Sequence, residues 1–438
     1  MRILLKIVKI SVATLVSGIA LLLVISAILE PQISKIFIQK VNQGLNTRAE
    51  VGKINFSLLR NFPQASVDLS DLVVYSPVKA NVAGDADTLL SAGHLFVSLK
   101  ITGLIRNEYI IDKIRIEKGR INISENIDGK TNLDIFKSTG KADSSALSIE
   151  LRSIRIEESY LHIKSSLRNI ETLLYLTEAD NRVSLAPSEG TVNLNATLNI
   201  ILFRVKDYLL PPYEGRIKTS ADLSFNSKAV QFERFSLDCN ETAVRASGKV
   251  GLKGGEISAD FILSPTNIPD MLGLAGLAAA EKAEEYGLNG TVSATGNINK
   301  PGIEGDPAEV NILFSLGRGR VSVPGARKEI SDITATGAYS FKIESPATTS
   351  LVKIDKLTAS TGSSRITAAG TVKNLYSPQV DIEISGDIET SDVASLVKLE
   401  KIKIEGVVRS NIRLYGSIPH KKKSSLLKTC CFSGDPPT

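Results

Sequence analysis

The chain has 438 residues, of which 42% are hydrophobic, 5% aromatic and 23% charged, with a formal net charge of +5. This apolar content suffices for a sizeable core, and opposite charges are interspersed along the body of the chain, which argues against a nucleic-acid surface. There is no tryptophan, and only three cysteines and three scattered histidines are present, so we expect no disulfide framework and no Cys/His metal cluster.

Residues 10–29 form an uncharged run. As a helix rising about 1.5 Å per residue, the run would span about 30 Å, the thickness of the hydrocarbon core of a bilayer. Three basic residues precede it, so we expect residues 1–9 in the cytoplasm and the rest of the chain across the membrane. The alternative is a cleaved signal peptide, but the run is long for that purpose and Ile25 occupies the place of a small residue before Ala27. We favour a retained anchor.

Residues 30–47 carry apolar side chains at helical spacing, which predicts a juxtamembrane amphipathic helix. Such a helix could pack against the first strands or act as a lid at an opening beside the membrane. From residue 48 the apolar period changes from helical to two. The stretch 51–77 then predicts two strands with a turn near residues 61–63.

Three similar segments, at 114–123, 154–163 and 314–323, place apolar residues symmetrically about a central polar pair. Each pattern predicts a β-hairpin with a two-residue turn at that pair. The side chains expected to face each other are Ile114 with Ile123, Ile116 with Ile121, Ile154 with Ile163, Ile156 with Leu161, Phe314 with Val323, and Leu316 with Val321. We therefore expect a meander of antiparallel strands with one apolar face.

Residues 192–200, 217–226 and 380–388 also alternate between apolar and polar side chains. Their apolar positions include Leu194, Leu198, Ile382 and Ile384. Strands of this kind bury one face and leave the other in water. We assign residues 48–210 to an N-terminal β region.

A larger repeat follows. The pattern of residues 232–250 returns at 354–372, that of 259–271 at 380–393, and that of 288–301 at 404–419. These similarities predict two β repeats, 211–302 with a helix at about 268–286, and 303–419, which is incomplete. Residues 420–438 share nothing with the repeat and are rich in lysine, which indicates either a disordered tail or an early end of the reading frame; we favour the second.

Motifs that carry chemistry are missing from the sequence. There is no phosphate-binding glycine loop, no nucleophile elbow and no metal-ligand spacing. Carboxylate pairs such as Glu157-Glu158 and Glu284-Glu285 are typical of solvated turns and helix surfaces. The glycosylation triplets at Asn195, Asn240 and Asn289 occur often by chance. We therefore expect neither an enzyme nor a bound cofactor.

The alternating strands permit two architectures. In an ordinary β-sandwich two apolar faces cover each other, whereas in a single curved sheet the apolar face stays partly open. The alternation alone does not distinguish them.

The N-terminal third of the chain resembles a known family. Residues 92–123, followed by the segment DGKTNLDIF at 128–136, are similar to the strand, "I..I.IE.G.I.I" and "DG..N" motifs of the AsmA family, and residues 51–77 and the anchor resemble forms from the Bacteroidetes lineage. The likeness covers residues 1 to about 140 well and the later repeats loosely. The chain departs from the family pattern at its end.

The resemblance implies a mainly β protein in which an N-terminal transmembrane helix is followed by an elongated, curved antiparallel sheet, a repeating β-groove with a few short helices. Its relatives in shape include TamB and other bridge-like lipid-transfer proteins. It also implies a single-pass protein of the inner membrane, with a cytoplasmic N-terminus and most of the chain in the periplasm, that contributes to outer-membrane biogenesis.

Our functional expectation is therefore a groove that holds or conducts phospholipid acyl chains. The alternative is a non-enzymatic assembly factor for outer-membrane β-barrel proteins, whose partners would be those proteins. The lipid class, the direction of transport and the oligomeric state stay open. The residues expected to line the groove are Ile114, Ile116, Ile121, Ile123, Ile154, Ile156, Leu161, Ile163, Leu194, Leu198, Phe314, Leu316, Ile382 and Ile384.

Overall fold

A computed structural model describes residues 45–61, 64–77, 88–100, 110–135, 148–186, 189–205, 208–210, 213–252, 255–275, 281, 283–302, 306–397, 406–417 and 430–434. The expected anchor at 10–29 and nearly all of the expected amphipathic helix at 30–47 lie outside the described residues, so both stay predictions. Within the described part of the chain, no helix is long and apolar enough to cross a membrane. The protein is mainly β, as expected, and divides into two compact units, residues 1–214 and 215–438.

The first unit is one sheet. Its strands are β1 (Ala49–Glu50), β2 (Lys53–Asn61), β3 (Gln64–Tyr75), β4 (Thr88–Lys100), β5 (Ile110–Glu125), β6 (Ser148–Ser165), β7 (Ile170–Ala186), β8 (Glu189–Val205) and β9 (Tyr208–Leu210). Strand β3 pairs with β1, β2 and β4, and from β4 to β9 each strand pairs with the next along the chain.

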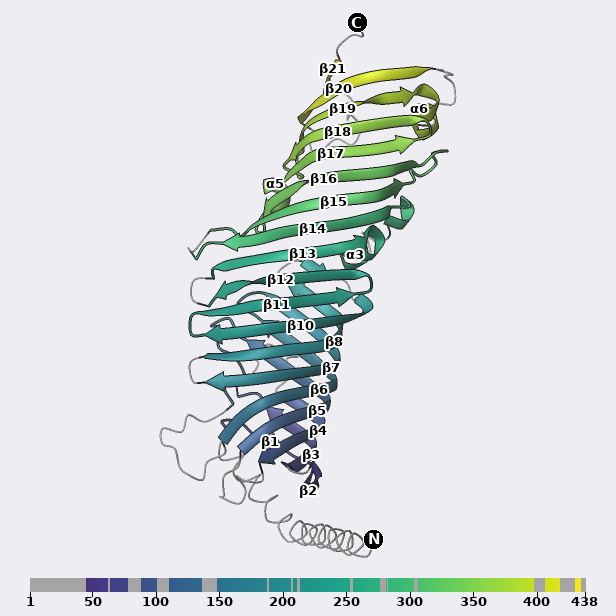
Figure 1. The fold of residues 1–438 in the computed structure, drawn as a ribbon. Coiled ribbons are helices and arrows are strands. Elements are labelled where there is room, and N and C mark those ends of the chain that lie inside the picture. Colours follow the sequence, from purple (N-terminus) through teal and green to yellow (C-terminus); the bar gives the residue numbers. More distant parts are fainter. Residues whose placement is uncertain are drawn as a thin grey trace, which may run out of the picture. The chain divides into compact units, whose positions relative to one another are not determined.

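The second unit is a meander whose strands pair in chain order. They are β10 (Tyr213–Asn226), β11 (Ala229–Cys239), β12 (Thr242–Gly251), β13 (Ile257–Asn267), β14 (Asn289–Lys300), β15 (Glu309–Val321), β16 (Ile330–Lys342), β17 (Leu351–Thr361), β18 (Ser364–Lys373), β19 (Gln379–Glu389), β20 (Val407–Ser417) and β21 (Cys430–Gly434). Helices α3 (Ile268–Ala275) and α6 (Thr390–Val397) lie where the strands end on one side of this sheet, and the short α5 (Pro346–Thr349) lies at the opposite ends of the strands (Figure 1).

The repeat has a structural counterpart in this unit. Three strands, a helix and a fourth strand follow one another in β11–β12–β13–α3–β14, and the same order returns in β17–β18–β19–α6–β20. The helix expected at 268–286 begins at Ile268, and it is described as α3 to Ala275, with further helical residues at 281 and 283–285. The expected tail at 420–438 contains one strand, β21, which pairs with β20. An edge strand offers unpaired backbone groups to any extended segment nearby, which is the physical basis of that pairing.

The three predicted hairpins are wrong. Residues 114–123, 154–163 and 314–323 each run straight through a single strand, β5, β6 or β15, the last extending just beyond its end. At the expected turns, Lys118, Glu158 and Arg318 have φ of 53°, 47° and 52°, the left-handed conformation that non-glycine residues rarely adopt. At Arg318 the register of β15 with both neighbouring strands shifts by one residue, which is a β-bulge that bends the strand and raises its twist. At Lys118 and Glu158 strands β5 and β6 keep their register with each other and with the strands on either side.

The left-handed residues account for the misleading symmetry. In β15 the more buried side chains are Leu316 and those before it at even positions, but Gly319 and Val321 after the bulge. A bulge therefore exchanges the two faces of the strand pattern, as a two-residue hairpin turn would. The apolar residues on both sides of the bulge do share one face, but within one bent strand rather than across two.

One strand pair departs from the expected antiparallel meander. Strands β5 and β6 run parallel, with Ile114 beside Ile154, Ile116 beside Ile156, and Lys118 and Glu158 at the same level. The similar segments at 114–123 and 154–163 are therefore two like strands that lie side by side in register. The left-handed residues Asp71, Lys118 and Glu158 lie in one line across β3 to β6, as the pairs on either side of them show.

Ser159 links β5 and β6 next to the left-handed residues Lys118 and Glu158. It is fully buried, its hydroxyl donates to the Glu157 carbonyl at 2.7 Å, and it accepts the Gly119 N–H at 2.9 Å. The serine thus satisfies a buried backbone donor, which would be costly to leave unpaired.

We expect Ser159→Ala to lower the free energy of unfolding of the first unit by about 1–3 kcal/mol, because the buried Gly119 N–H then has no partner. Denaturant unfolding followed by circular dichroism measures the change. Ser184→Ala, at an exposed position of β7, is the control and should stay within about 0.5 kcal/mol of the parent protein. Equal effects of the two substitutions would contradict this role for Ser159.

Asp392 fastens α6 to the turn between β17 and β18. Its side chain is 1% exposed, and Oδ2 accepts the N–H groups of Ser363 and Ser364 at 2.9 Å and the Ser364 hydroxyl at 2.7 Å. Lys328 pairs with the other carboxylate oxygen. Burial alone would raise the pKa of Asp392, but the hydrogen bonds from Lys328 and Ser364 outweigh it and lower the pKa to about 2.

The lowered pKa makes the attachment of α6 depend on pH. Because the folded-state pKa lies below the ordinary value of 3.8, Asp392 contributes about 2 kcal/mol above pH 4, and the contribution is lost as the pH falls towards 2. We expect Asp392→Asn to remove that contribution at neutral pH and to flatten the acid dependence. Hydrogen exchange of the Ser363 and Ser364 amides measures this locally, and unchanged protection in the variant would contradict the attachment.

Candidate functional site

The candidate site of the second unit is the face of the sheet that carries the alternating apolar side chains, here called the apolar face. Two rows of cross-strand neighbours run along it and contain no charged residue. One row consists of Leu263, Ala294, Phe314, Gly337, Ile354, Gly370, Ile382 and Leu414, and the other of Val292, Leu316, Ala335, Leu357, Ala368, Ile384 and Ile412.

Four residues predicted from the sequence meet in these rows. Phe314 and Ile382 belong to the first row, Leu316 and Ile384 to the second, although about seventy residues of chain separate the members of each pair. The intervening row members, such as Ile354 and Leu357, were not among the predicted residues. The alternation in 351–361 could have revealed them, but the bulge in β17 between Ile354 and Leu357 interrupts it.

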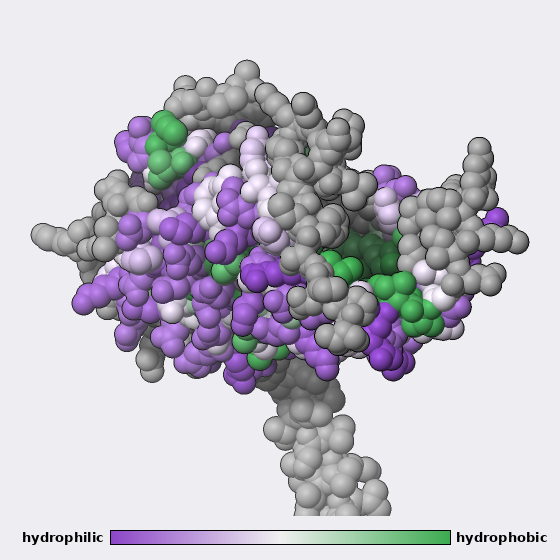
Figure 2. Space-filling view, turned by 90° about the horizontal axis from the view of Figure 1, so that it is seen from above, coloured by the Kyte–Doolittle hydropathy of each residue, from purple (hydrophilic) through white to green (hydrophobic). Residues whose placement is uncertain are grey.

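Among the residues that the structure describes, no second layer of the kind found in a sandwich covers the apolar face of the second unit. All row members except Ala335 and Gly337 are partly exposed rather than buried, and β19 alternates between exposed and partly exposed residues from Gln379 to Ile388. In the end-on view of Figure 2, hydrophobic residues gather in a recess while hydrophilic residues dominate the surrounding surface. An apolar face left partly open is available to an apolar guest.

The opposite face is ionic. Arg413 binds Asp381 through two hydrogen bonds of 2.9 Å, and Arg409 binds Asp387 at 2.9 Å, with all four side chains about half exposed or more. The hydrogen bond to Arg413 lowers the pKa of Asp381, and the bond to Asp387 raises that of Arg409. Neighbouring residues of one strand thus face either an ionic surface in water or the apolar face.

Glycines let the aromatic rings lie along the apolar face. A Cβ added to Gly337 would lie 2.9 Å from Cζ of Phe314, and one added to Gly296 would lie 2.5 Å from Cζ of Phe261. Each ring therefore covers a glycine of the neighbouring strand, an arrangement that compensates for the missing side chain. The same Cβ on Gly337 would be 2.1 Å from the Lys353 carbonyl oxygen, so the backbones also approach closely there.

In the first unit, the remaining ten predicted residues also share one face. The pairs Ile114–Ile154 and Ile116–Ile156 continue through Asn181 to Leu194 and through Ala179 to Ala196, and Leu198 faces Leu176. Two further rows lie beyond Lys118 and Glu158. One consists of Leu90, Ile121, Leu161, Leu174 and Ile200, and the other of Ile123, Ile163, Thr172 and Phe203. Only Ile116 among the ten is buried; the others are partly exposed.

One end of the first unit is closed by its own side chains. Phe56, Val67 and Leu99 are at most 1% exposed and form a core cluster with four neighbours on β2 to β5. Because these side chains of β2 to β5 are already buried, no guest fits among them. The available part of this face lies on the rows of β5 to β8.

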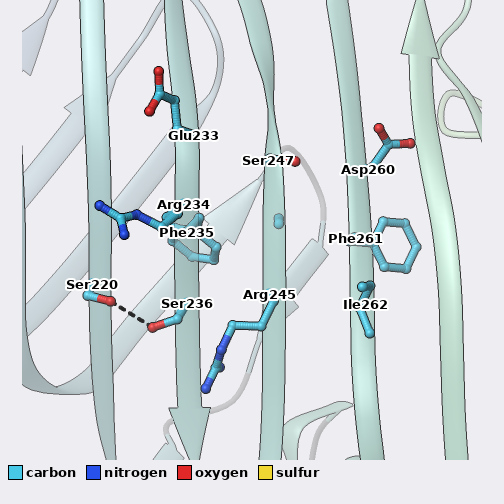
Figure 3. A pocket seen from close by; sticks show the side chains of 11 residues that line it. Ser220, Glu233, Arg234, Phe235, Ser236, Arg245, Ser247, Asp260, Phe261 and Ile262 are labelled. Carbon is cyan, nitrogen blue, oxygen red and sulfur yellow. Dashed lines mark hydrogen bonds between the residues drawn. The ribbon is translucent and has the colours of Figure 1, made fainter.

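A separate cavity of about 420 Å³ lies on β10 to β13 (Figure 3). The cavity lies beside a bulge in β11, at which two consecutive residues, Glu233 and Arg234, are exposed. Arg234 is paired with Asp222 and Arg245 with Asp238, so both cations of the cavity are already bound. Across the described residues, no three His, Cys, Asp or Glu side chains gather as a metal site. This cavity brings together no catalytic constellation.

Comparison with known proteins identifies no relative: no family model, no curated protein and no solved structure matches the chain. The function is therefore argued from the geometry of the apolar face.

We expect Gly337→Ala to destabilise the second unit by about 1–3 kcal/mol, because the new methyl group collides with the Lys353 carbonyl and the Phe314 ring. Thermal unfolding measures the change. Gly317→Ala is the matched control, since its Cβ would meet nothing nearer than 3.6 Å and its φ needs no glycine. A control as unstable as the test variant would show that the close approach at Gly337 is not the cause.

Proposed function

We propose that the apolar faces of this protein hold or conduct the acyl chains of membrane phospholipids. The observation that carries the proposal is the pair of uncharged rows on β13 to β20, whose members other than Ala335 and Gly337 are partly exposed although they are apolar. Partly exposed Ile, Leu and Phe side chains in continuous rows cost free energy in water, and a hydrocarbon guest would remove that cost.

Magnitudes favour a passive groove over a chemical step. Moving an acyl chain of about 14 methylenes into water costs roughly 11 kcal/mol at about 0.8 kcal/mol per methylene. A continuous apolar face keeps those methylenes out of water at every step, so the chain can move along it at nearly constant free energy. The polar head can stay in water, and no catalytic residue is required.

The cellular setting belongs to the same proposal. The uncharged run 10–29, with basic residues before it, supports a single-pass anchor in an inner membrane, with the N-terminus in the cytoplasm and the β units in the periplasm. The resemblance of residues 1 to about 140 to the AsmA family supports a role in the lipid homeostasis of the outer membrane. Both rest on the sequence alone.

Ile382→Asp together with Ile384→Asp tests the groove. Two charges in neighbouring rows should strongly reduce the lipid that co-purifies with the full chain, because a carboxylate next to a guest methylene has to lose its hydration. Mass spectrometry of extracted lipid, normalised to protein, measures the effect, and circular dichroism checks that the sheet is retained.

The matched control carries the same change on apolar residues of the opposite face. Ile262 and Leu313 are 53% and 63% exposed, and we expect Ile262→Asp with Leu313→Asp to leave the bound lipid unchanged. Equal lipid content in the parent protein, the groove variant and the control would overturn the proposal.

A further inference from the structure

A second apolar feature lies at one edge of the first unit and is not part of the proposed groove. Ile127 and Leu133, in the loop 126–135, are 66% and 51% exposed, and Leu167, in the turn between β6 and β7, is 49% exposed. The loop and the turn are neighbours, because a Cβ on Gly129 would lie 3.6 Å from Cδ2 of Leu167. We call Ile127, Leu133 and Leu167 the apolar edge.

The loop 126–135 holds its apolar side chains outward through a well-formed hydrogen-bond network. Asn132 is 2% exposed; its side-chain oxygen accepts the Ser124 N–H at 2.9 Å, and its side-chain nitrogen donates to the Asn122 carbonyl at 2.8 Å. The side-chain oxygen of Asn126 accepts two further backbone N–H groups within the loop. A loop fastened in this way presents its apolar groups without an ordering cost on binding.

The chain enters the first unit at the same edge. The N–H of Asn46 donates to the Ile135 carbonyl at 2.7 Å, so the described chain begins against the loop that carries the apolar edge. The uncharged run 10–29 lies shortly upstream. Even a fully extended connection, at about 3.5 Å per residue, holds Asn46 within about 60 Å of the end of that run.

Charges around the apolar edge are nearly balanced. Arg168 of the turn is paired with Glu125, and the exposed charges of the loop are Lys130, Asp128 and Asp134. Among the described residues of this loop and turn, there is no cationic excess that would select anionic lipid or a nucleic acid. The chemistry therefore favours contact with the apolar boundary of a bilayer through the three aliphatic side chains.

We propose that the apolar edge inserts into the surface of the bilayer that holds the N-terminal segment. The inference rests on the anchorage given under the proposed function, and it adds a second contact that sets the orientation of the first unit against the membrane. An inserted aliphatic loop of this kind reaches roughly 5–10 Å into the boundary between headgroups and acyl chains.

The absence of tryptophan allows a direct test with the full chain. Single variants Ile127→Trp, Leu133→Trp and Leu167→Trp each place one fluorophore on the apolar edge. Leu252→Trp, at a turn of the second unit with 56% exposure, is the matched control, and Ile382→Trp reports on the groove. The proteins are reconstituted into nanodiscs of phosphatidylcholine with or without bromine on the acyl chains, and quenching of tryptophan emission is compared.

We expect severalfold stronger quenching, with blue-shifted emission, at the three edge positions than at residue 252. In detergent, with brominated lipid bound but no bilayer, the edge positions should lose their quenching while residue 382 keeps it. Quenching at residue 382 without quenching at the edge would overturn this inference and leave the groove intact. Quenching at the edge without quenching at residue 382 would count against the groove alone.

Two other outcomes also contradict the inserted edge. A blue shift at the edge that grows with protein concentration and is insensitive to bromine would show that a second copy of the chain covers it. Failure of the full chain to co-elute with nanodiscs would contradict the anchor and the inserted edge together.

Discussion

The structure depends on keeping apolar side chains on one face of strands that bend. In β15 the bulge at Arg318 adds one residue, which would exchange the two faces of the strand if the apolar pattern did not shift with it. In β5, β6 and β15 the pattern shifts at Lys118, Glu158 and Arg318, each in the left-handed conformation. The apolar side chains of each of these strands therefore stay on one face on both sides of that residue.

That constraint links local conformation to the proposed function. Regular strands twist only gradually, and in β5 and β6 the left-handed residues lie at one level. Ser159 hydrogen-bonds across this level between β5 and β6, and Asp392 holds α6 against the turn between β17 and β18. These two buried polar groups bind backbone groups where the chain departs from a regular strand, and the rows of the second unit contain no charged residue.

The two units use the apolar face differently. Around Phe56, Val67 and Leu99 the first unit packs its own side chains together, as a globular domain does. Along β19 the residues from Val380 to Ile388 that point to the apolar face stay partly exposed. The closed cluster supplies stability, and the partly open rows supply the surface on which the proposed function depends. The apolar edge at Ile127, Leu133 and Leu167 is a third arrangement, with apolar groups on hydrogen-bonded loops.

Local alternation predicted the mainly β class and part of the apolar face, although row members such as Ile354 and Leu357 were missed. Alternation of period two is a local property of a strand, so it identified β8, β10 and β19, and the repeat identified the shared order of strands and helix in the second unit. Which strands are neighbours, and whether a break in the alternation is a turn or an irregular point within one strand, depends on contacts between residues far apart in the chain. The three-dimensional contacts alone show that Ile114 lies beside Ile154 in a parallel pair and that Phe314 shares a row with Ile382. They alone also show that the apolar face is closed at Phe56 and partly open at Ile382, because burial depends on what packs above a side chain, and nothing in the local pattern records that.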